Sequence, residues 1–243
     1  MTRPPEPAPA AAPGPVALVG SGEFLPAMEA VDAGLLAGRP PRAVFLPTAA
    51  GEEGPERLDY WLGLGVEHYR RLGVEPVPLP VIDRRGASDP DAAARLAGAG
   101  LVYLSGGNPG YLADTLRDTP VLRAIVAAWQ AGAALAGCSA GACALTDVAG
   151  DTRTGAVRPG LALVPGLVVL PHFDRIEQWR GAIVEERLAT LAGGQTLIGV
   201  DEDTALVRRG DTWLVEGRQR VWLLGTDGRR TPYEPGAIVP VGK

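Results

Sequence analysis

One serine stands between small residues where an apolar run passes into a helix-prone run, in the segment AALAGCSAGACALTD (133–147). Residues 137–141, Gly-Cys-Ser-Ala-Gly, fit the pattern G-x-S-x-G. Small neighbours allow a sharp strand-to-helix turn that exposes the serine hydroxyl, and the next helix presents its N-terminal amides and positive dipole end to an oxyanion. The pattern therefore predicts that Ser139 attacks a carbonyl carbon; the alternative is a structural turn.

Cys138 is a competing nucleophile, because Ala136 and Ala140 also give it small neighbours. Glutamine amidotransferases use a cysteine at such a turn. The alternative for Cys138 is a small buried hydrophobic residue, the commonest role of a free cysteine. Cys143 follows one helical turn later and is interpreted as a packing residue.

A serine nucleophile needs a base, and the chain has two histidines. His172 follows the apolar run LVVLP (167–171), so it is predicted at a strand end, as Ser139 is. His68 lies in an amphipathic helix pattern and is predicted at the surface. We therefore expect His172 to be the general base.

An acidic side chain must then orient the imidazole and stabilise its charged form. Residues 201–203, Asp-Glu-Asp, directly follow the predicted strand at 196–200, whereas Asp147 and Asp151 lie closer to the serine in sequence. Residue type and spacing leave these candidates open.

A second glycine segment follows an apolar run within LVYLSGGNPGYL (101–112). Adjacent glycines let backbone amides approach a substrate closely. If this segment lies beside the strand that ends at the sharp turn around Ser139 (the elbow), the N–H groups of Gly107 and Ala140 are predicted to be the two oxyanion donors. The alternative is an ordinary turn. Residues 20–24, Gly-Ser-Gly-Glu-Phe, lack the remaining signature of a dinucleotide or phosphate loop and are predicted to form a loop at the rim of the site.

The elements that must position these residues are short apolar runs alternating with helical stretches, which predict an α/β fold with a mostly parallel sheet sandwiched by helices. The predicted strands are 16–20, 43–48, 74–82, 101–107, 133–139, 167–173 and 196–201, and the predicted helices are 55–73, 89–100, 110–118, 120–132 and 175–194. Active-site residues belong at the carboxyl ends of such strands. Two strand-like runs within 212–230 predict a C-terminal antiparallel β-extension.

Composition limits the function classes. The 243 residues are 46% hydrophobic and 21% charged, which excludes a wholly disordered chain. Residues 1–14, rich in Pro and Ala, are predicted to be a disordered leader, and residues 15–243 a single domain.

A net charge of -5 without a long basic run argues against nucleic acid as a partner. Two cysteines without a second Cys/His cluster predict no metal site and suit the cytoplasm, and no run is long and apolar enough for a membrane span.

Six segments together resemble the dipeptidase E and cyanophycinase family of serine peptidases: GSGEF (20–24), FLPTA (45–49), LSGGN (104–108), GCSAGA (137–142), LVVLPHF (167–173) and IGVDEDTAL (198–206). The resemblance implies a class I glutamine amidotransferase-like fold. The residues that it assigns to catalysis are Ser139 as nucleophile, His172 as base, Glu202 as orienting acid, and Gly107 and Ala140 as oxyanion donors. Asp151 is the alternative acid.

The dipeptidase E branch is similar to the chain through Pro-His-Phe and through Glu-Glu-Arg-Leu (185–188). Cyanophycinases resemble one another in His-Phe-Ser with closely spaced arginines, where this chain has His172-Phe173-Asp174. The resemblance implies hydrolysis of dipeptides with an N-terminal Asp, without metal or organic cofactor, by a monomer or homodimer. The alternatives are cyanophycinase-like β-aspartyl cleavage and a catalytically silent binding protein. Asn108 and Arg175 are the expected substrate-binding residues, with Arg175 holding a carboxylate or, alternatively, being a solvated charge at a helix start.

Overall fold

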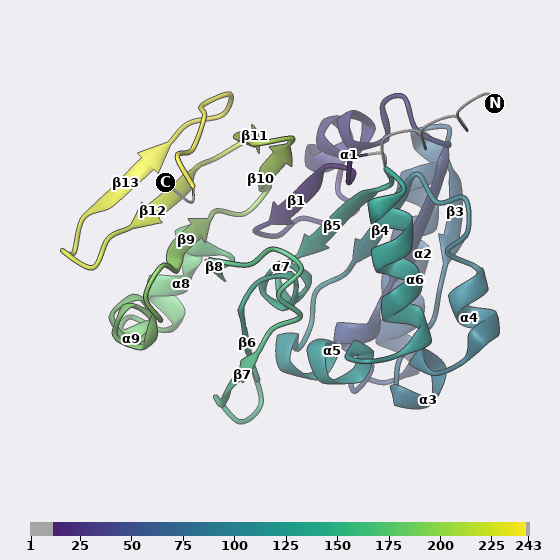
Figure 1. Cartoon of the computed structure of the whole chain (residues 1–243), viewed down its shortest axis with the longest axis horizontal. Coiled ribbons are helices and arrows are strands. Elements are labelled where there is room, and N and C mark those ends of the chain that lie inside the picture. The colour runs from purple at the N-terminus through teal and green to yellow at the C-terminus, as the bar shows by residue number, and fades with distance from the viewer. Residues whose placement is uncertain (1–11, 242–243) are drawn as a thin grey trace, which may run out of the picture.

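A seven-stranded sheet in the order β11-β10-β1-β5-β4-β2-β3 forms the centre of the computed structural model, which describes residues 12–241 apart from the side chain at position 177 (Figure 1). Its strands are β1 (Val16–Val19), β2 (Arg42–Leu46), β3 (Glu75–Pro78), β4 (Leu101–Leu104), β5 (Ala134–Cys138), β10 (Thr204–Arg209) and β11 (Thr212–Gly217). The strands from β1 to β3 in this order pair in parallel, and β10 and β11 add to the edge of β1 in antiparallel fashion. The predicted α/β fold with a mostly parallel sheet is confirmed.

Both faces of the sheet are buried because successive strand residues enter different cores. In β1, Leu18 packs into one hydrophobic cluster and Val19 into the other. The helices are α1 (Glu29–Leu36), α2 (Pro55–Arg71), α3 (Arg84–Ala87), α4 (Pro90–Ala94), α5 (Pro109–Leu116), α6 (Pro120–Gln130) and α7 (Ala140–Leu145). Residues of α1 and α2 cover one face, and residues of α5, α6 and α7 cover the other. This two-sided cover explains the unbroken apolar strands.

A second, four-stranded sheet departs from the predicted arrangement. It has the order β13-β12-β9-β8 and consists of β8 (Leu167–Leu170), β9 (Thr196–Val200), β12 (Val221–Leu224) and β13 (Arg230–Tyr233). The two C-terminal runs are antiparallel strands, as predicted, but they belong to different sheets, β11 beside β10 and β12 beside β9. The chain crosses between the sheets at residues 201–203, which lie between the end of β9 and the start of β10.

The helix predicted over 175–194 is two helices, α8 (Phe173–Trp179) and α9 (Ile183–Thr190), which pack on the second sheet. Gly181 lies in the break, where its low helix propensity favours interruption. A hairpin of β6 (Val148–Gly150) and β7 (Val157–Pro159), absent from the sequence prediction, follows α7. In Figure 1 the hairpin hangs below α7, with α8 and α9 to its left, and both the hairpin and the helix pair supply residues that line the site.

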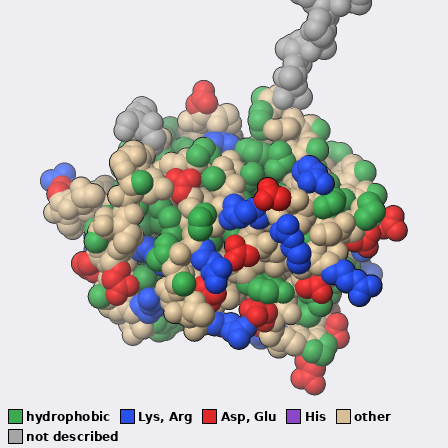
Figure 2. All heavy atoms as spheres, turned by 60° about the horizontal axis from the view of Figure 1, so that its bottom comes forward, with side chains coloured by type: hydrophobic (Ala, Val, Ile, Leu, Met, Phe, Trp, Pro, Cys, Tyr) green, Lys and Arg blue, Asp and Glu red, His purple; other side chains and the backbone are tan. Residues whose placement is uncertain are grey.

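Most of the predicted leader, residues 1–11, lies outside the described part of the chain. Gly14 is held by Trp129, whose carbonyl oxygen accepts from the Gly14 N–H at 2.9 Å and whose indole N–H donates to the Gly14 oxygen at 2.8 Å. Within residues 12–241, no helix has the length and apolar character needed to cross a membrane. Acidic and basic side chains are interspersed on the face seen in Figure 2.

Candidate active site

Ser139 occupies a strained turn between β5 and α7. Its backbone has φ 49° and ψ -104°, a region that side-chain-bearing residues rarely adopt. A Cβ at Gly137 would lie 2.4 Å from the carbonyl carbon of Gly141, and a Cβ at Gly141 would lie 2.2 Å from the Leu104 oxygen. The two glycines of the motif are therefore steric requirements. Strain of this kind persists only where the surroundings over-determine it, and it clusters at functional sites.

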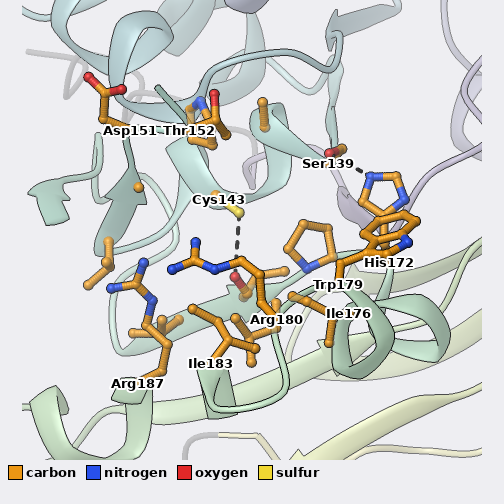
Figure 3. Close-up of a pocket in the computed structure, with 18 of the residues that line it drawn as sticks. Ser139, Cys143, Asp151, Thr152, His172, Ile176, Trp179, Arg180, Ile183 and Arg187 are labelled. Carbon is orange, nitrogen blue, oxygen red and sulfur yellow. Dashed lines mark hydrogen bonds between the residues drawn. The ribbon is translucent and has the colours of Figure 1, made fainter. Parts of the chain in front are cut away.

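Two contacts connect the serine to a histidine and a carboxylate. Ser139 Oγ lies 2.9 Å from His172 Nε2, and His172 Nδ1 lies 2.9 Å from Glu202 Oε1 (Figure 3 shows the first contact). His172 follows β8, and Glu202 follows β9, so the second sheet supplies both. A neutral imidazole that donates Nδ1–H to Glu202 has a free lone pair at Nε2, which can accept the serine proton.

The tertiary structure separates Glu202 from the acidic residues next to it. The Asp201 side chain is buried and accepts from the Arg220 N–H at 3.2 Å and from the Trp222 indole N–H at 3.0 Å. Burial raises the pKa of Asp201. Asp203 lies 3.7 Å from the Arg218 guanidinium. Of the three, Glu202 is the one that contacts the histidine.

The other two acidic candidates have structural contacts. Asp151 Oδ1 accepts from the amides of Arg153 at 2.9 Å and Thr154 at 3.0 Å, and these bonds hold the pKa of Asp151 below its usual range. Asp147 Oδ2 accepts from the Gly166 N–H and from the Gln195 amide. Asp151 nevertheless lines the pocket that contains Ser139.

Two backbone amides face the same pocket. Gly107 and Ala140 both line it beside Ser139, and within residues 12–241 neither amide donates a hydrogen bond to another residue. Gly107 has φ 136°, and a Cβ there would lie 2.4 Å from the backbone of Ala49, so only glycine fits this close approach. Unpaired amides at an elbow and at a neighbouring strand end are the geometry of an oxyanion hole.

The pocket in front of Ser139 has a volume of about 330 Å³ and contains charges of both signs. Figure 3 shows Arg180 and Arg187 reaching in from the side of α8 and α9, with Asp151 on the opposite side. Arg180 lies 3.7 Å from Glu186. Among the described residues, the Arg187 guanidinium has no hydrogen-bond or ion-pair partner, so it is available to a ligand carboxylate.

Trp179 completes the rim, with its ring centroid 5.6 Å from that of His172 and 62% of the residue exposed. Sequence reasoning missed Trp179, Arg180 and Arg187 as pocket residues. The available signal was the run of polar and aromatic residues directly downstream of the candidate base, but which of them face the serine depends on the break between α8 and α9.

The two residues expected to bind substrate have other contacts. Asn108 caps α5 by accepting from the Tyr111 N–H at 3.2 Å, and its amide lies 3.4 Å from Asp151. Arg175 lies 3.7 Å from Glu202 Oε2 and 3.5 Å from Asp174. Neither is among the residues that line the pocket, whereas Arg180 and Arg187 are.

Both cysteines are buried, which disfavours a cysteine nucleophile. Burial, together with the nearby Glu23 carboxylate, holds the pKa of the Cys138 thiol far above its usual range. Cys143 lines the pocket, but burial raises its pKa to about 12 and its thiol donates to the Val169 oxygen at 3.4 Å. Neither thiol is ionised near neutral pH.

The prediction that His68 lies at the surface is wrong. Its side chain is fully buried, and Nε2 lies 2.7 Å from Asp32 Oδ2. The polar partner is on α1, an element absent from the sequence prediction, so the helix pattern around His68 could not reveal it.

Known proteins are similar to this chain in sequence. The chain is 30% identical over 194 residues to the cyanophycinase of Trichormus variabilis, covering 74% of this chain and 64% of that protein. It is 29% identical to the cyanophycinase of Synechococcus elongatus over 188 residues, covering 72% and 56% respectively. The chain thus spans less than two thirds of the length of these curated relatives.

Among solved structures, a peptidase from an acI-B1 actinobacterium is 37% identical with a TM-score of 0.87, and the match covers 95% of this chain and 98% of that one. A candidate peptidase E protein from Listeria monocytogenes shares the fold, with a TM-score of 0.64 at 20% identity, covering 85% and 99%. The family model for peptidase family S51 matches residues 16–215, from the first strand of the central sheet into its last. Because that match spans most of the chain, the protein belongs to peptidase family S51.

Proposed function

We propose that the protein hydrolyses short peptides with an N-terminal acidic residue, with Ser139 as nucleophile, His172 as general base and Glu202 as the orienting acid. The observation that carries the proposal is the continuous set of contacts from Ser139 Oγ through the imidazole to Glu202, each 2.9 Å long. The unpaired amides of Gly107 and Ala140 beside the serine support it.

The proposed reaction has two halves. Ser139 Oγ attacks the scissile carbonyl while His172 Nε2 takes the hydroxyl proton, and Glu202 stabilises the imidazolium. The Gly107 and Ala140 amides donate to the oxyanion. The C–N bond then breaks as His172 returns its proton to the departing amine. Water repeats the sequence on the acyl-enzyme, which releases the acid and restores Ser139.

Charge in the pocket supports the acidic preference. Arg187 can form two parallel hydrogen bonds with a side-chain carboxylate, a geometry that a guanidinium favours. Asp151 lines the other side of the pocket, but its carboxylate is engaged by the Arg153 and Thr154 amides and lies 3.6 Å from Arg158, so the Arg187 guanidinium carries the preference. In this proposal Arg175 acts on Glu202, with which it is in contact, rather than on the substrate.

The second candidate is cyanophycinase-like cleavage of a β-aspartyl bond, which the identity to two cyanophycinases favours. The same triad would serve it, because only the linkage presented to Ser139 differs. Only the preferred substrate distinguishes these two candidate functions, because both would use the same catalytic residues.

The test is a panel of α-Asp, β-Asp, Glu and neutral dipeptides, with release of free amino acid as the readout. We expect turnover of an acidic member and its loss in Ser139→Ala. Ser88→Ala is the matched control, because Ser88 only bonds its own helix at 2.8 Å. Hydrolysis that is unchanged in Ser139→Ala would overturn the proposal, and turnover confined to β-Asp substrates would favour the second candidate.

A further inference from the structure

The loop after β1, residues 20–24, contacts the segments at the ends of β4, β5 and β9, three of the strands that supply the site. The Glu23 side chain is 6% exposed and uses both carboxylate oxygens. Oε1 accepts from the Gly106 N–H at 2.9 Å, and Oε2 accepts from the Cys138 thiol at 2.7 Å. Gly106 precedes Gly107, and Cys138 precedes Ser139, so one carboxylate connects the two segments that carry the oxyanion amides.

The loop is itself held rigidly. A Cβ at Gly20 would lie 2.1 Å from the Asp201 oxygen, and a Cβ at Gly22 would lie 2.3 Å from Asp203 Oδ1, so the loop packs directly on the residues that flank Glu202. Phe24 is buried with φ 64°, an outlier for a bulky residue. Its ring centroid is 5.3 Å from that of Tyr103. This anchoring fixes Glu23 against the site.

The Gly106–Gly107 pair needs such a contact. Backbone hydrogen bonds hold its two ends, from the Ser105 N–H to Leu46 at 3.1 Å and from the Asn108 N–H to Ala49 at 2.8 Å. Between these anchors stand two glycines, whose backbones are freer than those of other residues. The bond from the Gly106 N–H to Glu23 fixes the peptide that joins Ser105 to Gly106, so that only the φ and ψ angles of Gly106 remain to set the direction of the Gly107 amide.

We propose that Glu23 is a positioning residue that aims the Gly107 amide at the oxyanion and keeps it in register with the Ser139 elbow through Cys138. The inference rests on the proposed function of Ser139, Gly107 and Ala140. Glu23 does not line the pocket, so it acts through the backbone and not by touching substrate.

The two hydrogen-bond donors to Glu23, the Gly106 N–H and the Cys138 thiol, decide which substitutions test the proposal. Glu23→Gln keeps the side-chain shape but has one acceptor oxygen, so it can satisfy either the Gly106 amide or the Cys138 thiol. Glu23→Ala satisfies neither. Cys138→Ser retains a donor toward Glu23, and Cys138→Ala removes it. Asp32→Asn is the matched control, because Asp32 is also a buried carboxylate, on the same side of the sheet, but bonds His68 instead of the catalytic loops.

We would measure kcat and KM on the best substrate of the dipeptide panel, the thermal midpoint of each variant, and amide hydrogen exchange at Gly106. We expect kcat to fall roughly tenfold to 100-fold in Glu23→Ala and less in Glu23→Gln, short of the full loss of an oxyanion donor. KM should stay within about twofold, because the affected contact forms in the transition state. Exchange at Gly106 should accelerate, and Cys138→Ser should retain more kcat than Cys138→Ala.

Asp32→Asn should lower the thermal midpoint without changing kcat. The inference is overturned if folded Glu23→Ala, or Glu23→Gln where the alanine variant does not fold, keeps wild-type kcat. It is equally overturned if kcat falls in Asp32→Asn as it does in the Glu23 variants. Failure of the proposed function is a separate result, because it would be seen as hydrolysis that persists in Ser139→Ala.

Discussion

The backbone N–H of Glu202 donates to the Asp174 side chain, with 2.9 Å between the nitrogen and Oδ1. Asp174 lies two residues after His172, at the start of α8, so the segment that carries His172 also holds the segment that carries Glu202. The Gln219 amide donates to the Glu202 carbonyl oxygen at 3.0 Å and so fixes the peptide on the other side of the Glu202 Cα. The Glu202 side chain is therefore directed at the imidazole by its backbone as well as by its own contact.

Replacing Glu202 tests the histidine tautomer. In Glu202→Gln the amide N–H₂ can face Nδ1 and favour the tautomer with the proton on Nε2, which cannot accept from Ser139. We expect kcat to fall on the order of 10³–10⁴-fold, as for the equivalent change in other serine peptidase triads. Asp147→Asn is the control, since Asp147 bonds Gly166 and Gln195 away from the triad. Activity in Glu202→Gln equal to that of this control would contradict the assignment.

Replacing Arg187 tests substrate charge. Loss of one charge-assisted contact is worth about 1.5–3 kcal/mol, so Arg187→Ala should raise KM for an acidic dipeptide roughly tenfold to 100-fold. KM for a neutral dipeptide should change little, and Arg187→Lys should recover part of the loss because lysine keeps the charge but not the planar fork. Arg123→Ala serves as control, because Arg123 bonds the Asp118 oxygen at the surface. An equal change in KM for acidic and neutral substrates would argue against the carboxylate contact.

The lowered pKa of Asp151 predicts that the stability of the folded chain depends on pH. Hydrogen bonds from the Thr154 and Arg153 amides lower its pKa in the folded chain, so the unfolded chain takes up the proton first as pH falls. The stabilisation is therefore complete above the ordinary Asp pKa of about 3.9 and is lost as pH falls through the lower folded value. The difference in thermal midpoint between wild type and Asp151→Asn should shrink on acidification from about pH 5 to below about pH 4. A difference that stays constant over this range would show that the charge of Asp151 is not stabilised.

Two glycines in α2 should respond in opposite directions to the same substitution. A Cβ at Gly63 meets nothing within 4 Å, so Gly63→Ala should stabilise the protein by about 0.5–1 kcal/mol through helix propensity. A Cβ at Gly65 would lie 2.6 Å from the Phe45 ring, so Gly65→Ala should destabilise it by about 1–3 kcal/mol. Urea denaturation of the two variants measures both, and equal signs would contradict the packing of α2 on β2.

Local sequence determined much of the central sheet and the identity of the candidate nucleophile and base. The steric demands of the turn at Ser139 fall on its immediate neighbours Gly137 and Gly141, so five consecutive residues carry the signal. Strands buried on both faces are apolar throughout, and the choice of His172 needed only the end of one such strand. These features depend on contacts within a few positions of the chain.

Tertiary structure decided which acidic residue contacts His172, which arginines line the pocket and which groups Glu23 contacts. Residues 201–203 are alike in sequence, and only the crossing between the two sheets turns Glu202 toward His172 and Asp201 toward Trp222. Arg187 enters the pocket because the chain breaks between α8 and α9. Glu23 and Cys138 are 115 positions apart, and their contact exists because β1 and β5 are neighbours in the sheet. Side-chain orientation at such junctions follows from packing between distant segments, which residue type and spacing do not encode.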